Sequence, residues 1–399
     1  MVLPFDVDDP LLARAAWSRI AEPGDAAASG LVQAVGPSEA LRWLAAPHGG
    51  GPALGGAAPG EEAPQGPAAA ARAKWAPRLD GLDPRRELRA LALLGGRLLT
   101  PDCPGWPKGL RDLGNLAPIC LWALGAPETV ETLGARLTAS AAVVGSRAST
   151  AYGETVTAQL VAELVGRGVA VVSGGAFGVD AAAHRAALGC GGFTVAVMAG
   201  GVDRLYPAGN ERLLRAVVAQ GAVVSEVPPG GAPRRERFLS RNRLIAAMTN
   251  VTVVTESGWR SGSHRTARDA AQLMRPVGAV PGPVTSASSA GCHKLVREGV
   301  ATLVTGASAV IELMAPLGSA LFDDRAAAPG ALDGLGAPDR QVFDALPKVR
   351  AATVSALVTA SGLSAAATMA ALARLERAGR AAENGGLWRR LRQVGDLGT

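Results

Sequence analysis

The sequence VAVVSGGAFGVD at residues 169–180 decides the fold. Its first four residues form the apolar, β-branched run that is typical of a strand buried on both faces. The small residues after them form a tight turn, and Asp180 is a predicted N-cap for a helix over Ala181–Leu188 that Gly189 ends. Strand, glycine turn and helix together form the repeating unit of a parallel α/β sheet.

The same alternation of strand and helix continues from Ala141 to Met314. A second helix is predicted over Glu211–Gln220, with Asn210 as its N-cap and Gly221 as its stop. Because apolar strands covered on both faces belong to parallel sheets, we predict an α/β fold with an extended Rossmann-like parallel-sheet core. Seven runs predict its strands: Ala141–Val144, Val169–Val172, Thr194–Met198, Ala222–Ser225, Val251–Thr255, Val277–Val280 and Ala301–Val304.

The segments on either side of this core differ from it in composition. Helical patterns at Leu11–Trp17 and Leu41–Leu44 precede a Gly-, Pro- and Ala-rich insertion, His48–Pro67, which carries too little apolar bulk to form a core of its own. A linker rich in Gly, Pro, Ala and Asp follows the core. We therefore predict a helical domain over 1–100, the Rossmann-like domain over 101–320, a linker over 321–338 and a further domain over 339–399.

The last domain is predicted to be a winged helix-turn-helix. A glycine-containing turn over Ser361–Ser364 separates two short helices, and the hairpin-like stretch Asn384–Arg390 follows. A three-helix protein-interaction module is the open alternative. The predicted helices are Asp339–Leu346, Thr353–Ala360 and Ala365–Ala378.

The charge distribution favours a polyanionic partner for the core and the last domain. The net charge is +6, and residues 101–338 and 339–399 carry 21 basic against 18 acidic and nine against five side chains. The four cysteines are widely spaced and predict reduced thiols rather than a disulfide scaffold. The acidic start lacks the basic and apolar regions of a secretory signal, and the apolar stretch Ala186–Val202 contains five glycines and a strand. We expect a cytoplasmic protein with no membrane span.

No cofactor is predicted. The turn after residue 173 does not match G-x-G-x-x-G, Thr194 stands about twenty residues on, where a dinucleotide site has an acid, and no Walker A sequence occurs. The three histidines of the core, His184, His264 and His293, lie far apart in the sequence, so no metal site is expected either. A local structural hydrogen bond is the expected role of His184, one helical turn after Asp180.

Four loops of small residues follow predicted strands and meet at the carboxyl edge of the sheet, where ligands bind in this class of fold. They are Gly145–Arg147, Ser173–Gly178, Gly200–Gly201 and Ser261–Ser263. The basic run Arg234–Arg243 adds five arginines and Phe238 at the same edge. Arginines neutralise phosphates and a phenylalanine stacks on an unpaired base, so the run predicts nucleic-acid binding, with a solvated arginine-rich loop as the alternative.

An ordered set of motifs over about 170 residues resembles the DNA-processing protein A (DprA/Smf) family. The set includes Gly145–Arg147, Tyr152-Gly153, Ser173–Asp180 with His184, Tyr206-Pro207 with Asn210, Ser225-Glu226, Arg241–Arg243, Ser261–Ser263 with Thr266-Ala267, and Pro281-Gly282. The match extends upstream through Leu99–Asp102 and Pro118–Gly125.

The resemblance implies a homodimer that binds single-stranded DNA on its Rossmann-like core and loads RecA recombinase during natural transformation. It also implies a small SAM-like helical domain at the N-terminus, and it implies no catalysis. Arg147 is expected to hold a phosphate, with a pocket around it. By position, the implied DNA-binding residues are Gly145, Ser146, Arg147, Ser173, Gly174, Gly175, Phe238, Arg241, Asn242, Arg243, Ser261, Gly262 and Ser263.

Two other functions remain open. Related Rossmann proteins of the lysine-decarboxylase-like group hydrolyse nucleoside monophosphates with a P-G-G-x-G-T-x-x-E element, but residues 261–269 lack its glutamate. In the second alternative, the C-terminal domain is a duplex DNA-binding regulator and the core senses a ligand.

Overall fold

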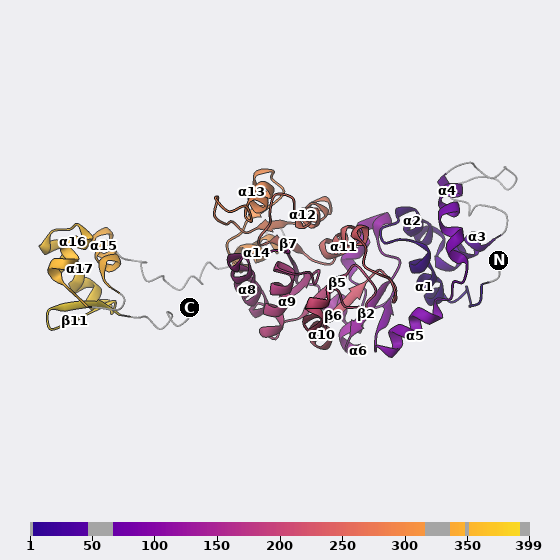
Figure 1. Ribbon diagram of the computed structural model, residues 1–399, viewed down its shortest axis with the longest axis horizontal. Coiled ribbons are helices and arrows are strands. Elements are labelled where there is room, and N and C mark those ends of the chain that lie inside the picture. Colours follow the sequence, from indigo (N-terminus) through magenta and orange to yellow (C-terminus); the bar gives the residue numbers. More distant parts are fainter. Residues whose placement is uncertain (1–2, 47–66, 316–335, 348–350, 392–399) are drawn as a thin grey trace. The chain divides into compact units, whose positions relative to one another are not determined.

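The computed structural model describes residues 3–46, 67–315, 336–347 and 351–391, which belong to two compact units, Met1–Ser319 and Ala320–Thr399 (Figure 1). The predicted insertion over 48–67 and the predicted linker over 321–338 lie almost entirely outside the described residues. Each unit is described by itself.

A nine-stranded sheet with the order β1-β2-β6-β5-β4-β3-β7-β8-β9 forms the centre of the first unit. All seven predicted strands are present and pair in parallel with one another. β1 (Arg97–Leu99) and β2 (Leu121–Gly125) were not predicted as strands, and they extend the sheet in antiparallel fashion beside β6. The parallel strands are β3 (Ser140–Val144), β4 (Ala170–Ser173), β5 (Thr194–Met198), β6 (Ala222–Ser225), β7 (Val251–Val254), β8 (Val277–Ala279) and β9 (Thr302–Leu303).

Helices cover both faces of the sheet because successive strand residues point to opposite sides. In β3, Ala142 and Val144 join a core with α11 (Arg235–Ala247), α12 (Ser263–Gln272) and α13 (Ala290–Arg297), whereas Val143 packs against the helices of the other face. Burial of each of these valine side chains contributes about 1.5–3 kcal/mol. The opposite layer contains α8 (Ala151–Gly166), α9 (Val179–Gly189), α10 (Glu211–Gln220) and α14 (Ala307–Met314).

The strand order reverses beside β3. From β3 the chain proceeds outward through β4, β5 and β6, and then returns to place β7 on the other side of β3 before it continues to β8 and β9. The loops that leave the carboxyl ends of β3 and β7 therefore diverge to opposite faces of the sheet. Such a switch point opens a crevice that binds ligands in α/β folds.

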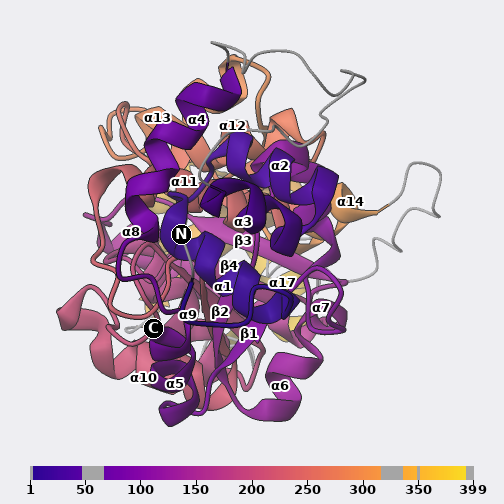
Figure 2. The ribbon, with the colours of Figure 1, turned by 90° about the vertical axis from the view of Figure 1, so that its right-hand side faces the viewer.

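The N-terminal helices belong to the same compact unit as the sheet (Figure 2). Trp17 and Trp75 meet edge to face at 5.4 Å in their core, and Ser29 Oγ donates to the carbonyl of Ala117 at 2.6 Å. The predicted boundary after residue 100 cuts through the sheet, because α5 and β1 already pack with it. The helices are α1 (Pro10–Ile20), α2 (Ala26–Val35), α3 (Pro37–Ala45), α4 (Pro67–Trp75) and α5 (Arg85–Leu93).

The second unit contains the three predicted helices and the predicted hairpin. Phe343, Leu357, Leu372 and Trp388 are buried in its core. Its assignment as a winged helix-turn-helix stays a prediction. The elements are α15 (Ala337–Ala345), β10 (Ala352–Thr353), α16 (Val354–Ser361), α17 (Ala365–Arg377), β11 (Ala381–Asn384) and β12 (Leu387–Arg390).

Among the described residues, no single helix is both long and apolar enough to cross a membrane. The pair α16 and α17 meets the length and composition test together, but the two helices are bent by 105°.

Candidate functional site

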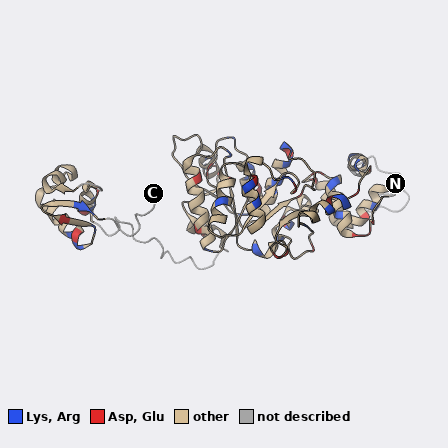
Figure 3. Ribbon diagram, turned by 60° about the horizontal axis from the view of Figure 1, so that its bottom comes forward, with Lys and Arg blue, Asp and Glu red and all other residues tan. Residues whose placement is uncertain are grey.

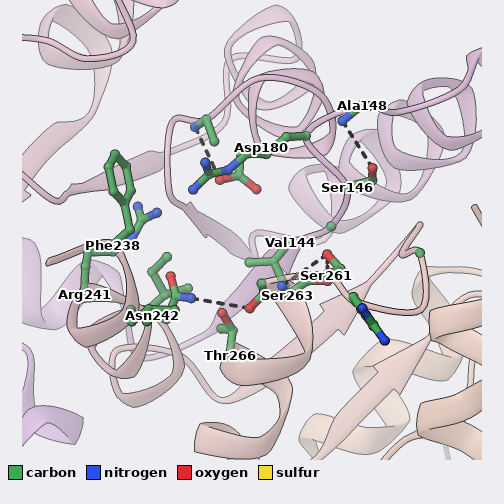
Figure 4. A pocket seen from close by; sticks show the side chains of 18 of the residues that line it. Val144, Ser146, Ala148, Asp180, Phe238, Arg241, Asn242, Ser261, Ser263 and Thr266 are labelled. Carbon is green, nitrogen blue, oxygen red and sulfur yellow. Dashed lines mark hydrogen bonds between the residues drawn. The ribbon is translucent and has the colours of Figure 1, made fainter. Parts of the chain in front are cut away.

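A cleft of about 700 Å³ opens at the switch point, where the loops after β3 and β7 face α11 (Figure 4). Its walls come from four segments far apart in the sequence: the loop after β3, the loop after β4 with the first turn of α9, one side of α11, and the loop after β7 with the first turn of α12. The lining residues include Gly145, Ser146, Arg147, Asp180, Arg235, Phe238, Arg241, Asn242, Arg260, Ser261, Gly262, Ser263 and Thr266.

Backbone hydrogen bonds fix the loop that carries Arg147. The N–H of Ser146 donates to the carbonyl of Glu256 at 2.8 Å, and the carbonyl of Ser146 accepts from the N–H of Val179 at 3.1 Å. Gly178 allows this close approach, since it has φ +74° and a Cβ atom there would lie 2.2 Å from the Ser146 oxygen. Three loops are thereby locked together behind an exposed Arg147.

The exposed Arg147 side chain lies against an aromatic ring rather than a carboxylate. Its guanidinium carbon is 5.1 Å from the centroid of Phe238, whose ring contacts that of Tyr206 at 5.9 Å. Arg147 makes no hydrogen bond or ion pair within the described part of the chain. A cation with free donors beside an aromatic face suits a ligand that carries both phosphates and bases.

From Arg235 onward the arginine run lies on helix α11 rather than in a loop. Helical periodicity divides its residues between different environments. Arg235, Phe238 and Asn242 all line the cleft. Arg241 is 5% exposed below them and donates to the carbonyls of Gly174, at 2.8 Å, and Val197. Burial lowers the pKa of Arg241 to about 10, so the guanidinium remains charged at neutral pH.

Nine of the predicted binding residues line the cleft and four do not. Ser173 is fully buried and donates to the carbonyl of Val143. Gly174 contributes no wall, but a Cβ atom there would lie 2.3 Å from the Arg241 guanidinium. Gly175 packs toward Leu214. Arg243 is buried away from the cleft and paired with Glu226 through two 2.8 Å contacts.

Asp180 and Asn210 do not cap their helices through their side chains as predicted. Gly178 occupies the N-cap of α9, and Asp180 accepts from the N–H of Ala176 at 3.3 Å instead. Asn210 sits at the N-cap of α10, but its amide donates to the carbonyls of Gly175 and Ala176 at 3.0 Å. Both side chains hold the glycine loop after β4 in place.

Sequence reasoning did not single out Arg235, Arg260 or Asp180 as binding residues. Arg235 was detectable, because it precedes Phe238 by three residues and Asn242 by seven, which places the three on one helix face. Arg260 lies in the loop after β7 and immediately precedes Ser261. Its position at the carboxyl edge of the sheet could therefore also be predicted from the sequence. Burial of Asp180 depends on the packing of α11 and carried no sequence signal.

The cleft contains four arginines and one carboxylate, Asp180. Lysine and arginine are scattered along the chain (Figure 3), so position rather than abundance distinguishes these four. Burial raises the pKa of Asp180, while Arg241 opposes that shift. His184 lies outside the cleft: it contacts Thr194 at 2.8 Å, and burial lowers its pKa to about 3.

Among the described residues, no group of three His, Cys, Asp or Glu side chains is arranged to hold a metal ion. Asp269, which stands at the position of the missing glutamate of the hydrolase element, does not line the cleft and pairs with Arg265 at 2.7 Å. The arrangement is suited to holding an anionic ligand that presents aromatic bases.

Fold and cleft together define a Rossmann-like α/β protein that carries a basic, aromatic-edged site at its switch point. The profile of the DNA recombination-mediator protein A family matches residues 97–315, and the chain belongs to that family. It is 44% identical to the DNA processing protein DprA of Mycobacterium tuberculosis over 397 residues, which cover 97% of this chain and 96% of the relative.

Two further similarities concern Streptococcus pneumoniae. The DNA processing protein DprA of that organism is 37% identical over 217 residues, covering 53% of this chain and 71% of the relative. The X-ray structure of DprA from Streptococcus pneumoniae superposes with a TM-score of 0.54 and 33% identity, covering 60% of this chain and 81% of that one. The predicted family and Rossmann-like fold are thus confirmed, and the family connects the protein with DNA processing in recombination.

Proposed function

We propose that this protein binds single-stranded DNA in the cleft between β3 and β7 and does so without catalysing a reaction. In this proposal it acts in the cytoplasm as a homodimer, protects DNA that enters during natural transformation, and loads RecA recombinase onto it. Membership of a family named for mediating recombination supports the biological setting.

The contact between Arg147 and Phe238 carries the proposal. Duplex DNA hides its base faces, whereas a single strand presents bases beside phosphates. Phe177 and Tyr206, 49% and 45% exposed, lie on the loops after β4 and β5, so exposed aromatic surface extends beyond the cleft wall. Exposed rings beside uncompensated arginines therefore favour a single strand over a duplex.

Comparison of single-strand and duplex affinity, for the full chain and for a chain that lacks residues 339–399, tests the proposal. We expect preference for the single strand in both chains. Tight, sequence-selective duplex binding by the second unit, residues 320–399, on its own would instead support the duplex-binding regulator.

The affinity for single-stranded DNA should fall steeply with salt. Each neutralised phosphate of a single strand contributes a slope of about −0.7 in log affinity against log salt, so Arg147, Arg235 and Arg260 together predict about −2. Titration of a labelled oligothymidylate across a salt series measures this slope. Arg147→Ala should reduce its magnitude by about 0.7, and a flat response in the parent would contradict electrostatic binding.

Incubation with adenosine monophosphate should release no adenine above the level of a protein-free control. Hydrolysis requires a positioned acid or base, and Asp180 is the one carboxyl group that lines the cleft. Chromatography of the products provides the measurement. Adenine release that disappears in Asp180→Asn would assign the cleft to the hydrolase group.

A further inference from the structure

Trp259 exposes half of its side chain immediately outside the cleft. It stands in the loop after β7, between Gly258 and Arg260, which both line the cleft, while Trp259 itself does not. Its side chain is 50% exposed. The ring faces α13 instead, where Lys294 Nζ lies 4.7 Å and the Arg297 guanidinium carbon 5.8 Å from the ring centroid.

The backbone around this ring is rigidly held. The N–H of Gly291 in α13 donates to the carbonyl of Ser257 at 2.7 Å, and the N–H of Ser257 donates to the carbonyl of Ser288 at 2.9 Å. A Cβ atom on Gly291 would lie 2.5 Å from the Gly258 oxygen, so helix and loop approach backbone to backbone. The loop and α13 thus present the Trp259 ring on a fixed support.

The charge around the ring is positive. Lys294 shares Glu298 with Arg268, at 3.8 Å and 3.1 Å respectively. Arg297 and Arg260 are exposed and form no ion pair within the ranges that the structure describes. Two cations lie against the half-exposed indole, Lys294 and Arg297, and Arg260 precedes Ser261 at the cleft. Such a group complements a phosphate backbone and leaves ring surface for a base.

We propose that Trp259, Lys294 and Arg297 form a second contact for single-stranded DNA, on which the strand continues after it passes Arg260 at the cleft. The inference rests on the proposed function of the cleft. Continuity between the two sites supports it, since Gly258, Trp259 and Arg260 are consecutive and the cleft opens beside them. A base stacks on the free part of the indole, and Arg297 and Lys294 neutralise the adjoining phosphates.

Oligonucleotide length separates the two contacts. Oligothymidylates of about 4 and about 16 nucleotides, the range of site sizes in single-strand-binding folds, are titrated against the full chain. Trp259→Ala should weaken binding of the long strand roughly tenfold, as loss of one stacked base does, and should leave the short strand within about twofold. Trp259→Phe should retain most of the long-strand affinity, because it keeps an aromatic face.

Two controls keep the test decisive. Leu94→Ala, which removes an equally exposed apolar side chain on the N-terminal side of the unit, should change neither affinity. Arg297→Gln changes an exposed side chain and should weaken the long strand more than the short one. Quenching of indole fluorescence by the long strand should be smaller in Trp259→Phe than in the parent.

The outcomes distinguish the two proposals. If the parent binds neither strand, the proposed function of the cleft is wrong. If the parent prefers the long strand, and Trp259→Ala and Arg297→Gln keep that preference with fluorescence quenching unchanged in Trp259→Phe, the second contact is wrong while the cleft stands.

Discussion

Replacement of Arg147 by alanine is expected to weaken single-strand binding about ten- to hundredfold. A charge-assisted contact contributes about 1.5–3 kcal/mol, and each 1.4 kcal/mol corresponds to a factor of ten. Within the described residues Arg147 makes no hydrogen bond or ion pair and lies against the Phe238 ring, so its donors are free for a phosphate. The Ser146 backbone bonds do not involve its side chain, and the variant should therefore keep its fold.

Fluorescence anisotropy with a labelled oligothymidylate measures the loss, and circular dichroism checks the fold. The matched control is Arg89→Ala on α5, which removes an exposed arginine without a hydrogen-bond or ion-pair partner among the described residues and should cost under about 1 kcal/mol. Arg390 is less suitable, because its guanidinium lies 3.8 Å from the Phe343 ring centroid and contributes to packing. Equal affinities for the Arg147→Ala variant and the parent would remove the cleft from the binding site.

The sequence was sufficient to predict the parallel part of the sheet because two-sided burial leaves a continuous apolar signature. The strands β3 to β7 are buried along their whole length. β1 contains three residues and pairs only with β2, which in turn pairs antiparallel with β6. Those pairings join segments that are distant in the sequence. The local pattern of residues 97–125 therefore could not predict them.

The candidate site was predictable where function depends on loop position and less so where it depends on side-chain direction. Gly145–Arg147 and Ser261–Ser263 follow strands, so their meeting at one sheet edge follows from topology. For the basic run on α11, the direction of each side chain was not predicted from the sequence. Within Arg241-Asn242-Arg243, only Arg241 and Asn242 reach the cleft, since consecutive helical residues point about 100° apart and Arg243 therefore faces Glu226.

This division predicts that Arg243→Ala damages stability rather than binding. Arg243 and Glu226 are 7% and 13% exposed in their side chains, and Arg243 also donates to the carbonyls of Leu116 and Ser240. Removal of one partner leaves an uncompensated buried charge, which costs about 3–5 kcal/mol. Urea unfolding of the full chain measures the change. Arg215→Ala, which breaks the exposed pair with Glu211, should cost under about 1 kcal/mol.

The pH dependence identifies the orphaned carboxylate as the cause. Burial already raises the pKa of Glu226, and Arg243 opposes that shift, so the pKa rises further in the variant. The folded variant then binds a proton at pH values where the unfolded chain has lost it, and its stability falls as pH rises from the ordinary carboxyl range through the raised pKa. The deficit of Arg243→Ala relative to the parent should therefore be smallest in acid and should grow as the pH rises through the raised pKa of Glu226. Addition of Glu226→Gln should recover most of it, because the unpaired charge is gone. A deficit that is independent of pH and unaffected by Glu226→Gln would show that packing, rather than charge, is what Arg243 supplies.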